Sequence, residues 1–260
     1  MPDTVIKIVL NQFRRFHVGS AVAFEDEMVA HSRMFSPRLS AVLGEAQLRS
    51  FIRFAIRRAE GHGFTLKGTV RLFIELAFLF GSSFDIDVQY PWIRMCLGEP
   101  DPGTQMQRAG ALHAATVTAL EEIHGPRNVY TYDSLRRLQS LAKALPRLNA
   151  NGFSDAVLAE VARVHPQKCA HVGEPSLREL IAFAGAEAKR HELFEMHEVL
   201  LLFVLMFSFG QGCTADPLYP WIGHTLANDR VSSASVRASQ LQRKALTWLR
   251  HVLGSNQQSP

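Results

Sequence analysis

Apolar residues recur at three- and four-residue steps along most of the chain. In residues 48–59 they occupy positions 48, 51, 52, 55, 56 and 59, with arginines between them. This spacing places apolar side chains on one face of an α-helix. Residues 25–35 predict a preceding helix that stops before Pro37, because the residue before a proline avoids the α region. The pattern therefore predicts an all-α protein. It leaves open whether residues 4–10 form a strand or a helix.

Two segments are apolar on nearly every side. Residues 66–80 contain "VRLFIELAFLF", and residues 199–209 read "VLLLFVLMFSF". A helix without a polar face has to be enclosed by neighbouring helices. The longest apolar run, residues 199–209, is too short to cross a bilayer. We therefore expect two buried core helices and no membrane insertion.

These two helices belong to a long internal repeat. The segment "FLFGSSFDIDVQYPWI" at 78–93 returns as "FSFGQGCTADPLYPWI" at 207–222, 129 residues later and without a gap. Upstream, "LGEAQLRSFIRFAIRRA" aligns with "VGEPSLRELIAFAGAEA" at the same offset. The sequence predicts a tandem duplication of a four- to five-helix bundle in a pseudo-twofold arrangement. Its parts are an N-terminal segment (1–23), repeat 1 (24–125), a helical connector (126–152), repeat 2 (153–254) and a tail (255–260).

The repeated motif predicts a helix end, a turn and a new helix start. A glycine suits the helix C-cap, and an aspartate in the turn can accept backbone N–H bonds. A tyrosine before proline should be extended, the proline suits the first helical turn, and the tryptophan can pack back on the apolar helix. A packing role explains the motif better than a binding role. Its residues are Gly81, Asp87, Tyr90, Pro91, Trp92, Gly210, Asp216, Tyr219, Pro220 and Trp221.

The remaining helices follow from the same rules. Residues 105–123 predict the last helix of repeat 1, and "DSLRRLQSLAKAL" predicts a connector helix capped by Asp133 and ended by Pro146. The second helix of repeat 1 ends in "GHGF", where a glycine can form a left-handed cap. Repeat 2 has "RHEL" there, so we expect that junction to close differently or the helix to run longer.

Composition narrows the functional classes. The 260 residues are 47% hydrophobic and carry a net charge of +4. The three cysteines, Cys96, Cys169 and Cys213, are far apart and odd in number, which predicts reduced, buried thiols. The first residues lack the pattern of a secretory signal, so a cytoplasmic location is expected. The basic residues are mixed with acids, and nucleic-acid binding, which needs a continuous basic stripe, is a weak alternative.

Candidate catalytic chemistry is sparse. The segment "KRHELFEMHE" lacks the two histidines four residues apart that a zinc protease needs. Asp85 has no acidic counterpart in repeat 2, which argues against a carboxylate pair. Glu75 lies in the apolar helix, where a salt bridge to Arg71 is expected. We therefore predict a non-enzyme with no catalytic residue, no cofactor and no metal.

Differences between the repeats suggest a protein-binding rim. Repeat 1 carries arginines on its second helix, whereas repeat 2 carries mixed charge at and near the corresponding positions. Such a contrast suits one asymmetric protein partner held at the seam between two helical bundles. The candidate rim residues are Arg53, Arg57, Arg58, Glu187, Arg190 and Glu192.

The motifs resemble a group of bacterial helical proteins encoded beside type VI secretion spike and effector genes. The likeness rests on residues in the first repeat: Gly44, Glu45, Leu48, Arg49, Ile52, Gly63, Phe64, Thr65, Gly81, Phe84, Asp85, Asp87, Pro91 and Trp92. Repeat 2 departs from the pattern at Leu193, Cys213 and Thr214.

The resemblance implies an accessory, non-catalytic role without a cofactor. One function is a chaperone or adaptor that holds a secreted effector or toxin for loading on the secretion spike. The alternative is an immunity protein that neutralises the toxin. The basic charge balance favours the chaperone over an inhibitor of a basic nuclease. The oligomeric state and the identity of the partner stay open.

Overall fold

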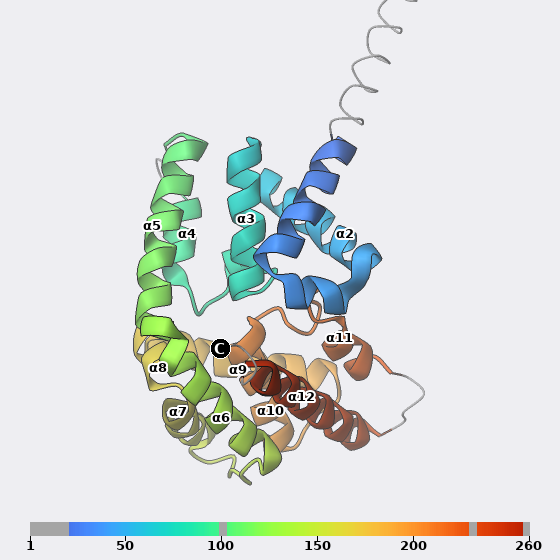
Figure 1. Ribbon diagram of the computed structural model, residues 1–260. Coiled ribbons are helices and arrows are strands. Elements are labelled where there is room, and N and C mark those ends of the chain that lie inside the picture. Colours follow the sequence, from blue (N-terminus) through green and yellow to red (C-terminus); the bar gives the residue numbers. More distant parts are fainter. Residues whose placement is uncertain (1–20, 99–102, 229–232, 257–260) are drawn as a thin grey trace, which may run out of the picture. The chain divides into compact units, whose positions relative to one another are not determined.

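A computed structural model describes residues 21–98, 103–228 and 233–256, and this part of the chain contains helices and no β-strand (Figure 1). The all-α prediction is confirmed. Residues 21–35 are helical. They are followed by α2 (Pro37–Gly61), α3 (Lys67–Phe80), η1 (Phe84–Ile86), α4 (Pro91–Leu97), α5 (Gln105–His124), η2 (Pro126–Asn128), α6 (Val129–Lys143), α7 (Phe153–Val164), α8 (Pro166–Val172), α9 (Glu174–Arg190), α10 (Met196–Phe209), α11 (Pro220–Leu226) and α12 (Ala234–Asn256).

Two predicted pieces lie largely outside the described residues. These are the N-terminal segment 1–23, with the ambiguous residues 4–10, and the tail 255–260. The chain divides into two compact units, one ending at Leu79 and the other beginning at Phe80. Phe80, the last residue of α3, therefore belongs with the second unit. The repeat boundaries inferred from the sequence stay a prediction.

In the first unit, aromatic side chains of α2 and of the connection after it pack against those of α3. The rings of Phe51 and Phe78 meet edge-on at 4.7 Å between centroids, and Phe64 meets Phe73 at 6.5 Å. Glu75 accepts a hydrogen bond from Arg71 at 3.0 Å, as predicted, and also contacts His31 at 2.7 Å. The acid in this apolar helix is thus balanced by basic neighbours.

Left-handed glycines separate a short helix from the helix that follows it in both halves of the chain. Gly44 has φ +71° inside α2, and Gly173 has φ +80° between α8 and α9. Because a left-handed residue breaks the helical hydrogen-bond ladder, residues 153–254 form six α-helices, α7–α12. The prediction of four to five was one too low for this half.

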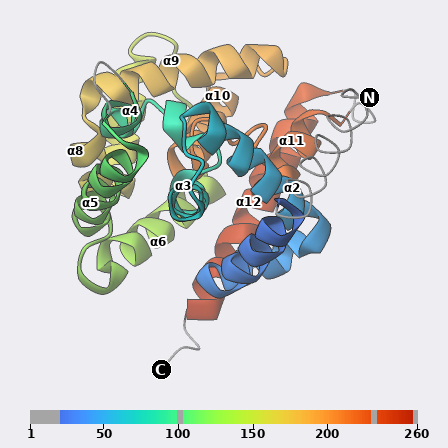
Figure 2. The same ribbon diagram turned by 90° about the horizontal axis from the view of Figure 1, so that it is seen from above.

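The second unit is built around α10. Eleven of its residues are buried, and α7, α9 and α12 pack against it. The prediction of an enclosed apolar helix is confirmed for this segment. Outside it, α6 lies against α12, and α5 packs on α4 and α8 (Figure 2). None of the helices in the described residues is both long enough and apolar enough to cross a membrane.

The junction after α9 corrects one expectation. Gly63 follows α2 with φ +72°, and Glu192 follows α9 with φ +61°. The backbone bonds also match: Phe64 N donates to Ala59 O and Leu193 N donates to Ala188 O, both at 2.9 Å. The two junctions therefore close in the same way, and the prediction of a different or longer helix was wrong. Glycine adopts this left-handed conformation without strain, whereas Glu192 adopts it although it has a side chain.

The connector helix and the cysteines give two further corrections. Helix α6 begins at Val129 after Asn128, so Asp133 lies inside the helix and pairs with Arg136 at 3.3 Å instead of capping it. The helix ends at Lys143, before Pro146. All three cysteines are free, but only Cys213 is buried. Cys96 and Cys169 are half-buried, because they lie on the short helices α4 and α8 at the edge of the core.

Candidate functional site

The two copies of the glycine motif meet in the second unit. Gly81 has φ +95° and Gly210 has φ +98°. A Cβ atom on Gly81 would stand 2.5 Å from the carbonyl oxygen of Phe209, and one on Gly210 would stand 2.7 Å from that of Phe80. Two independent reasons therefore require glycine at both positions: the left-handed backbone conformation and the close approach of the other turn. The predicted helix ends at these glycines are confirmed.

Each aspartate of the motif ties the two turns together. Asp87 accepts a bond from its own turn, Gln89 N at 2.9 Å, and one from the other turn, Gln211 N at 2.7 Å. Asp216 accepts bonds from Leu218 N and Ser82 N, both at 2.8 Å. The bonds within each turn follow from the sequence. The bonds between the turns do not, because nothing in the spacing shows that the two motifs face each other.

The rest of the motif anchors each turn to an apolar helix. Pro91 and Pro220 begin α4 and α11, as predicted. The ring of Trp92 meets Phe80 edge-on at 5.9 Å, and Trp221 meets Phe209 at 6.1 Å. Both tryptophans thus pack back on the last residue of the preceding long helix.

The tyrosines that precede these prolines are not extended as predicted. Tyr90 has φ −128° and ψ 63°, and Tyr219 has φ −128° and ψ 53°. The prolines do keep them out of the α region. A turn bond from each tyrosine N–H to the aspartate carbonyl oxygen, at 3.2 and 3.0 Å, curves the backbone.

Burial shapes the electrostatics of the paired turns. Removal from water raises the pKa of Asp87 and of Asp216, while their backbone hydrogen bonds act in the opposite direction. Burial likewise raises the pKa of Tyr90 and Tyr219. The carboxylate oxygens are occupied by backbone N–H groups, so the arrangement stabilises the chain instead of presenting a reactive acid.

A lysine that the sequence did not single out lies beside these turns. The side chain of Lys168, on α8, is buried, and its Nζ donates to the carbonyl oxygen of Phe207. The same Nζ lies 4.6 Å from the ring centroid of Phe207 and 5.5 Å from that of Tyr90. Burial lowers the pKa of Lys168 to about 8, and the charge of Asp87 opposes this shift. The first repeat has Leu39 at this position, and that difference was the available clue.

Two histidines accompany this lysine. Burial lowers the pKa of His165 to about 4, and it also lowers the pKa of His124; the charge of Lys168 adds to both shifts. Both imidazoles are therefore neutral at pH 7. His124 bonds Thr131 at 2.5 Å, and His165 Nδ1 accepts a bond from Lys168 N at 3.3 Å. Within the described residues, no group of three or more His, Cys, Asp or Glu side chains could hold a metal ion.

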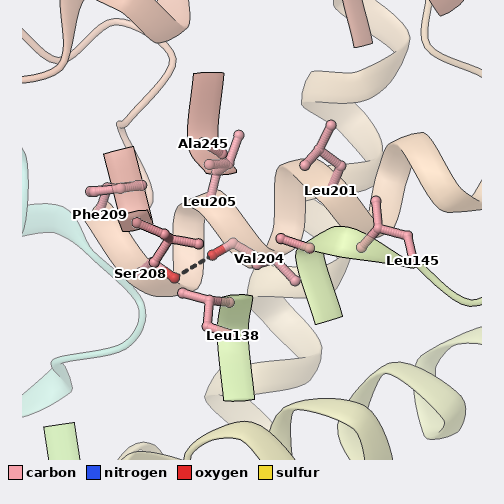
Figure 3. A pocket seen from close by; sticks show the side chains of 10 residues that line it. Leu138, Leu145, Leu201, Val204, Leu205, Ser208, Phe209 and Ala245 are labelled. Atoms are coloured by element: carbon pink, nitrogen blue, oxygen red, sulfur yellow. Dashed lines mark hydrogen bonds between the residues drawn. The ribbon is translucent and has the colours of Figure 1, made fainter. Parts of the chain in front are cut away.

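One cavity lies under α6 and α12, against α10 (Figure 3). Its volume is about 20 Å³, which is close to the space of a single water molecule. Its polar lining residue, Ser208, turns its hydroxyl to the Val204 carbonyl oxygen at 2.7 Å. Small-molecule sites have volumes of roughly 300–1,000 Å³ and a few convergent polar groups. This cavity is a packing defect. It is lined by Leu138, Ala142, Leu145, Leu201, Val204, Leu205, Ser208, Phe209, Ala245 and Leu249.

The candidate rim residues fall in both units. In the first unit, Arg53 and Arg57 are exposed on α2, and the guanidinium of Arg58 lies 5.6 Å from the ring centroid of Phe54. In the second unit, Arg190 and Glu192 are exposed.

Glu187 differs from the other rim residues. It is buried, with its carboxylate 3.4 Å from His191, 2.8 Å from Thr214 and 3.0 Å from Arg190. The hydrogen bond from His191, with a further one from Thr214, lowers the pKa of Glu187 to about 2 although burial opposes it. Glu187 thus orients its neighbours instead of facing solvent.

An exposed aromatic residue lies beside this part of the rim. Phe194 follows Glu192 by two positions and is 68% exposed. Aromatic side chains are enriched at the cores of protein–protein interfaces, so Phe194 is the candidate anchor in this part of the rim. The first repeat has the polar Thr65 at the equivalent position, and this difference is the signal in the sequence that marks Phe194.

Comparisons with known proteins give no relative. No protein-family model matches the chain, and neither curated proteins nor solved structures give a match. The resemblance to the type VI secretion group therefore rests on the sequence motifs alone.

Proposed function

We propose that this chain is a non-catalytic protein-binding module that acts as a cytoplasmic chaperone or adaptor for a type VI secretion effector. It would hold the toxin until loading on the secretion spike. An immunity protein that neutralises the toxin is the second candidate. The secretion context comes from the motif resemblance, and the structural support concerns the binding role.

A duplicated scaffold is part of this proposal. The bounds of α3 and α4 return in α10 and α11 at an offset of 129 residues, and the aspartate contacts of the two turns are reciprocal. A duplication with pseudo-twofold symmetry accounts for both observations, because equivalent turns then meet across one axis. It also accounts for a molecule with two related but chemically different surfaces.

The polar residues at the paired turns support binding over catalysis. The carboxylate oxygens of Asp87 and Asp216 accept hydrogen bonds from backbone N–H groups. Lys168 is enclosed by two aromatic rings and a carbonyl oxygen. Groups held this way maintain the fold, and their perturbed pKa values have a structural explanation.

Phe194 is the observation that carries the proposal. Its ring is 68% exposed, whereas Leu193, the residue before it, is 1% exposed. Folding does not need a phenyl ring in solvent, and burial of such a ring in a partner contributes about 1.5–3 kcal/mol. Glu192 and Arg190 flank it with opposite charges, which can orient a partner. We expect this surface of the second unit to contact the effector. Arg53, Arg57 and Arg58 of the first unit are a separate candidate contact.

The test is co-purification with the proteins encoded by neighbouring genes. Phe194→Ala should weaken capture of the effector at least tenfold, and Glu192→Lys and the double variant Arg57→Glu/Arg58→Glu should each weaken it less. The matched control is Met95→Ala, which removes a side chain that is 81% exposed on α4. Unchanged capture by Phe194→Ala and by both charge variants would rule out both candidate contacts.

The same complex separates the two candidate functions. A chaperone releases an active toxin, and its deletion lowers toxin level or export. An immunity protein keeps the bound toxin inactive, and its deletion leaves sister cells sensitive. Failure to recover any stable complex with a neighbouring gene product would count against both.

A further inference from the structure

Helices α6 and α12 together carry a larger net positive charge than the whole chain. Together they hold seven of the 28 Arg and Lys residues and one of the 24 acidic residues, a net charge of +6. The whole chain has a net charge of +4, so the remainder has −2. The excess of base, which looks mild and dispersed along the sequence, is therefore concentrated on two helices.

These helices lie side by side and run antiparallel (Figures 1 and 2). Gln242 on α12 donates to the carbonyl oxygen of Ala142 on α6 at 2.8 Å, which sets their register. In an antiparallel pair with this register, Lys143 stands opposite Leu241 and Arg136 opposite Trp248. Each is therefore displaced by only two residues, about 3 Å along the axis, from Arg243 or Arg250. Within each helix the two cations are seven residues apart, or about 10.5 Å. We call these four residues the basic ridge.

The basic ridge faces solvent and has little internal compensation. All four side chains are exposed. Asp133 pairs with Arg136 at 3.3 Å, and Arg250 bonds to its own helix at the Leu246 carbonyl oxygen and at Thr247. Among the described residues, no acidic side chain pairs with Lys143, Arg243 or Arg250. The helices bury their other faces through Leu138, Ala142, Ala245 and Leu249.

The two cations that α12 contributes to the ridge are specific to one repeat. Helix α5, at the equivalent place in the first repeat, has Ala114 and Glu121 where α12 has Arg243 and Arg250. The scaffold thus does not require these cations. Four like charges on two adjacent helices repel one another at low ionic strength, and an acidic ligand would relieve that repulsion.

We propose that the basic ridge binds an acidic helix of the partner protein, whose carboxylates recur at two-turn intervals and face the ridge. This assignment rests on the proposed function, that the chain binds another protein, and adds a second contact surface with a stated chemistry. Two packed helices present a shallow face, and neither projects as a groove-reading element of a DNA-binding protein does. The aromatic residue of α12, Trp248, turns inward to Phe209 at 4.7 Å, so it offers no base-stacking platform. These features favour protein over nucleic acid.

The experiment uses the full chain and three labelled probes. The first is a helical peptide of about 20 residues, built from Ala and Glu with Glu at positions i, i+4 and i+7. The second is the same peptide with Gln for Glu, and the third is duplex DNA of similar length. Fluorescence anisotropy at low and moderate salt measures binding. We expect the Glu peptide to bind best, with an affinity that falls as salt rises.

Matched variants locate the binding. Lys143→Glu/Arg243→Glu should weaken the Glu peptide at least tenfold. Arg94→Glu/Lys189→Glu changes the net charge equally at exposed positions on α4 and α9 and should change binding less than about twofold. Equal loss in both double variants, or no binding of the Glu peptide, would overturn the ridge assignment. Tighter, ridge-dependent binding of duplex DNA would reassign the ridge to nucleic acid.

Outcomes for the ridge and for the proposed function are distinguishable. If effector capture needs Phe194 and is insensitive to Lys143→Glu/Arg243→Glu, the protein-binding function stands and the ridge proposal fails. If the Glu peptide binds the ridge but no neighbouring gene product forms a complex, the ridge binds acidic helices and the secretion role fails.

Discussion

The turns at 81–92 and 210–221 have the same backbone and different surroundings. In both, a left-handed glycine ends a long helix, an aspartate accepts one bond from its own turn and one from the other turn, and a proline starts the next helix. The shared contacts are made by backbone atoms and by the one side chain that binds them. Their geometry therefore depends little on the residues around them.

The polar shell differs between the turns. Gln89 donates to Asp87 at 3.1 Å and to the Met206 carbonyl oxygen at 3.1 Å, and the Gln211 side chain accepts from Val88 N at 3.0 Å. Lys168 adds a buried cation on the same side. The residues equivalent to Gln89 and Lys168 are Leu218 and Leu39. The Asp87 turn thus has a glutamine and a lysine where the equivalent positions are leucines, although both turns hold the same backbone.

Substitution of the two glycines tests the shared part and should have the largest effect. Gly81→Ala and Gly210→Ala each place a methyl group 2.5–2.7 Å from a carbonyl oxygen at positive φ. We expect each to lower the free energy of unfolding by about 3 kcal/mol or more, because backbone cannot move aside cheaply. Chemical denaturation monitored by circular dichroism measures this.

Gly110→Ala is the matched control. A Cβ there meets no atom within 4 Å on helix α5. This change should stabilise the protein by up to about 1 kcal/mol. If Gly81→Ala were as well tolerated as Gly110→Ala, the close approach of the turns would not exist in solution.

Removal of each aspartate should destabilise the protein by a different amount for the two turns. Asp216→Ala leaves the N–H groups of Ser82 and Leu218 without their acceptor, and we expect a loss of about 2–4 kcal/mol. Asp87→Ala also removes the bond from Gln89 Nε2 and the nearby negative charge from Lys168, so its loss should be larger by about 1 kcal/mol. Thermal and chemical denaturation of both variants at pH 7 provide the comparison. Equal losses would mean that the polar shell adds nothing to the shared backbone contacts.

Lys168, which lies beside only one of the turns, should make the stability of the protein depend on pH. Its pKa falls from 10.5 to about 8 in the folded protein, so above pH 8 the unfolded chain binds more protons at this group. Stability from this group therefore rises with pH between about 8 and 10. Lys168→Leu introduces the residue found at the equivalent position of the other repeat and should remove this rise, which is at most about 1.4 kcal/mol per pH unit.

The comparison with the variant isolates this effect from other titrations. Cys169 and Tyr219, whose pKa values burial raises, shift stability in the opposite direction at high pH and are present in both proteins. Lys189→Leu, at an exposed lysine on α9, is the control and should leave the pH profile unchanged. Parallel profiles for wild type and Lys168→Leu would show that Lys168 does not titrate in this range.

The sequence predicts what depends on neighbours along the chain. Apolar periodicity located the helices, and Gly210 and Pro220 marked where α10 ends and α11 begins. It could not show that Asp87 bonds to Gln211, because that contact depends on how helices pack and not on spacing.

The exposure of single side chains and the clustering of charges could not be predicted from the sequence for the same reason. Glu187 was assigned to the rim by its charge, although Thr214, 27 positions later, helps to bury its carboxylate. Phe194 looked like any core residue, and the basic ridge is split over two helices that are 100 positions apart. Each of these features is a property of the surface, which forms only after the helices pack.

The turns after α2 and α9 allow the finest test of the comparison between repeats. Gly63 and Glu192 have the same left-handed backbone, but Glu192 lacks the freedom of glycine and forms an ion pair with Arg237 at 3.2 Å. Its side chain is 70% exposed, so the ion pair contributes between about 0 and 1 kcal/mol. Relief of a left-handed non-glycine residue contributes about 1 kcal/mol. Glu192→Gly should therefore leave stability unchanged or raise it by up to about 1 kcal/mol.

Two further variants separate strain from charge. Glu192→Ala keeps the strain and removes the ion pair, so it should be less stable than Glu192→Gly by about 1 kcal/mol. Gly63→Ala introduces the same strain in the first unit and should lower stability by about 1 kcal/mol. A larger destabilisation by Glu192→Gly than by Glu192→Ala would mean that the turn depends on the stiffness of a residue with a side chain. The two junctions would then be equivalent only in their hydrogen bonds. Denaturant midpoints measured at equal slope resolve differences of this size.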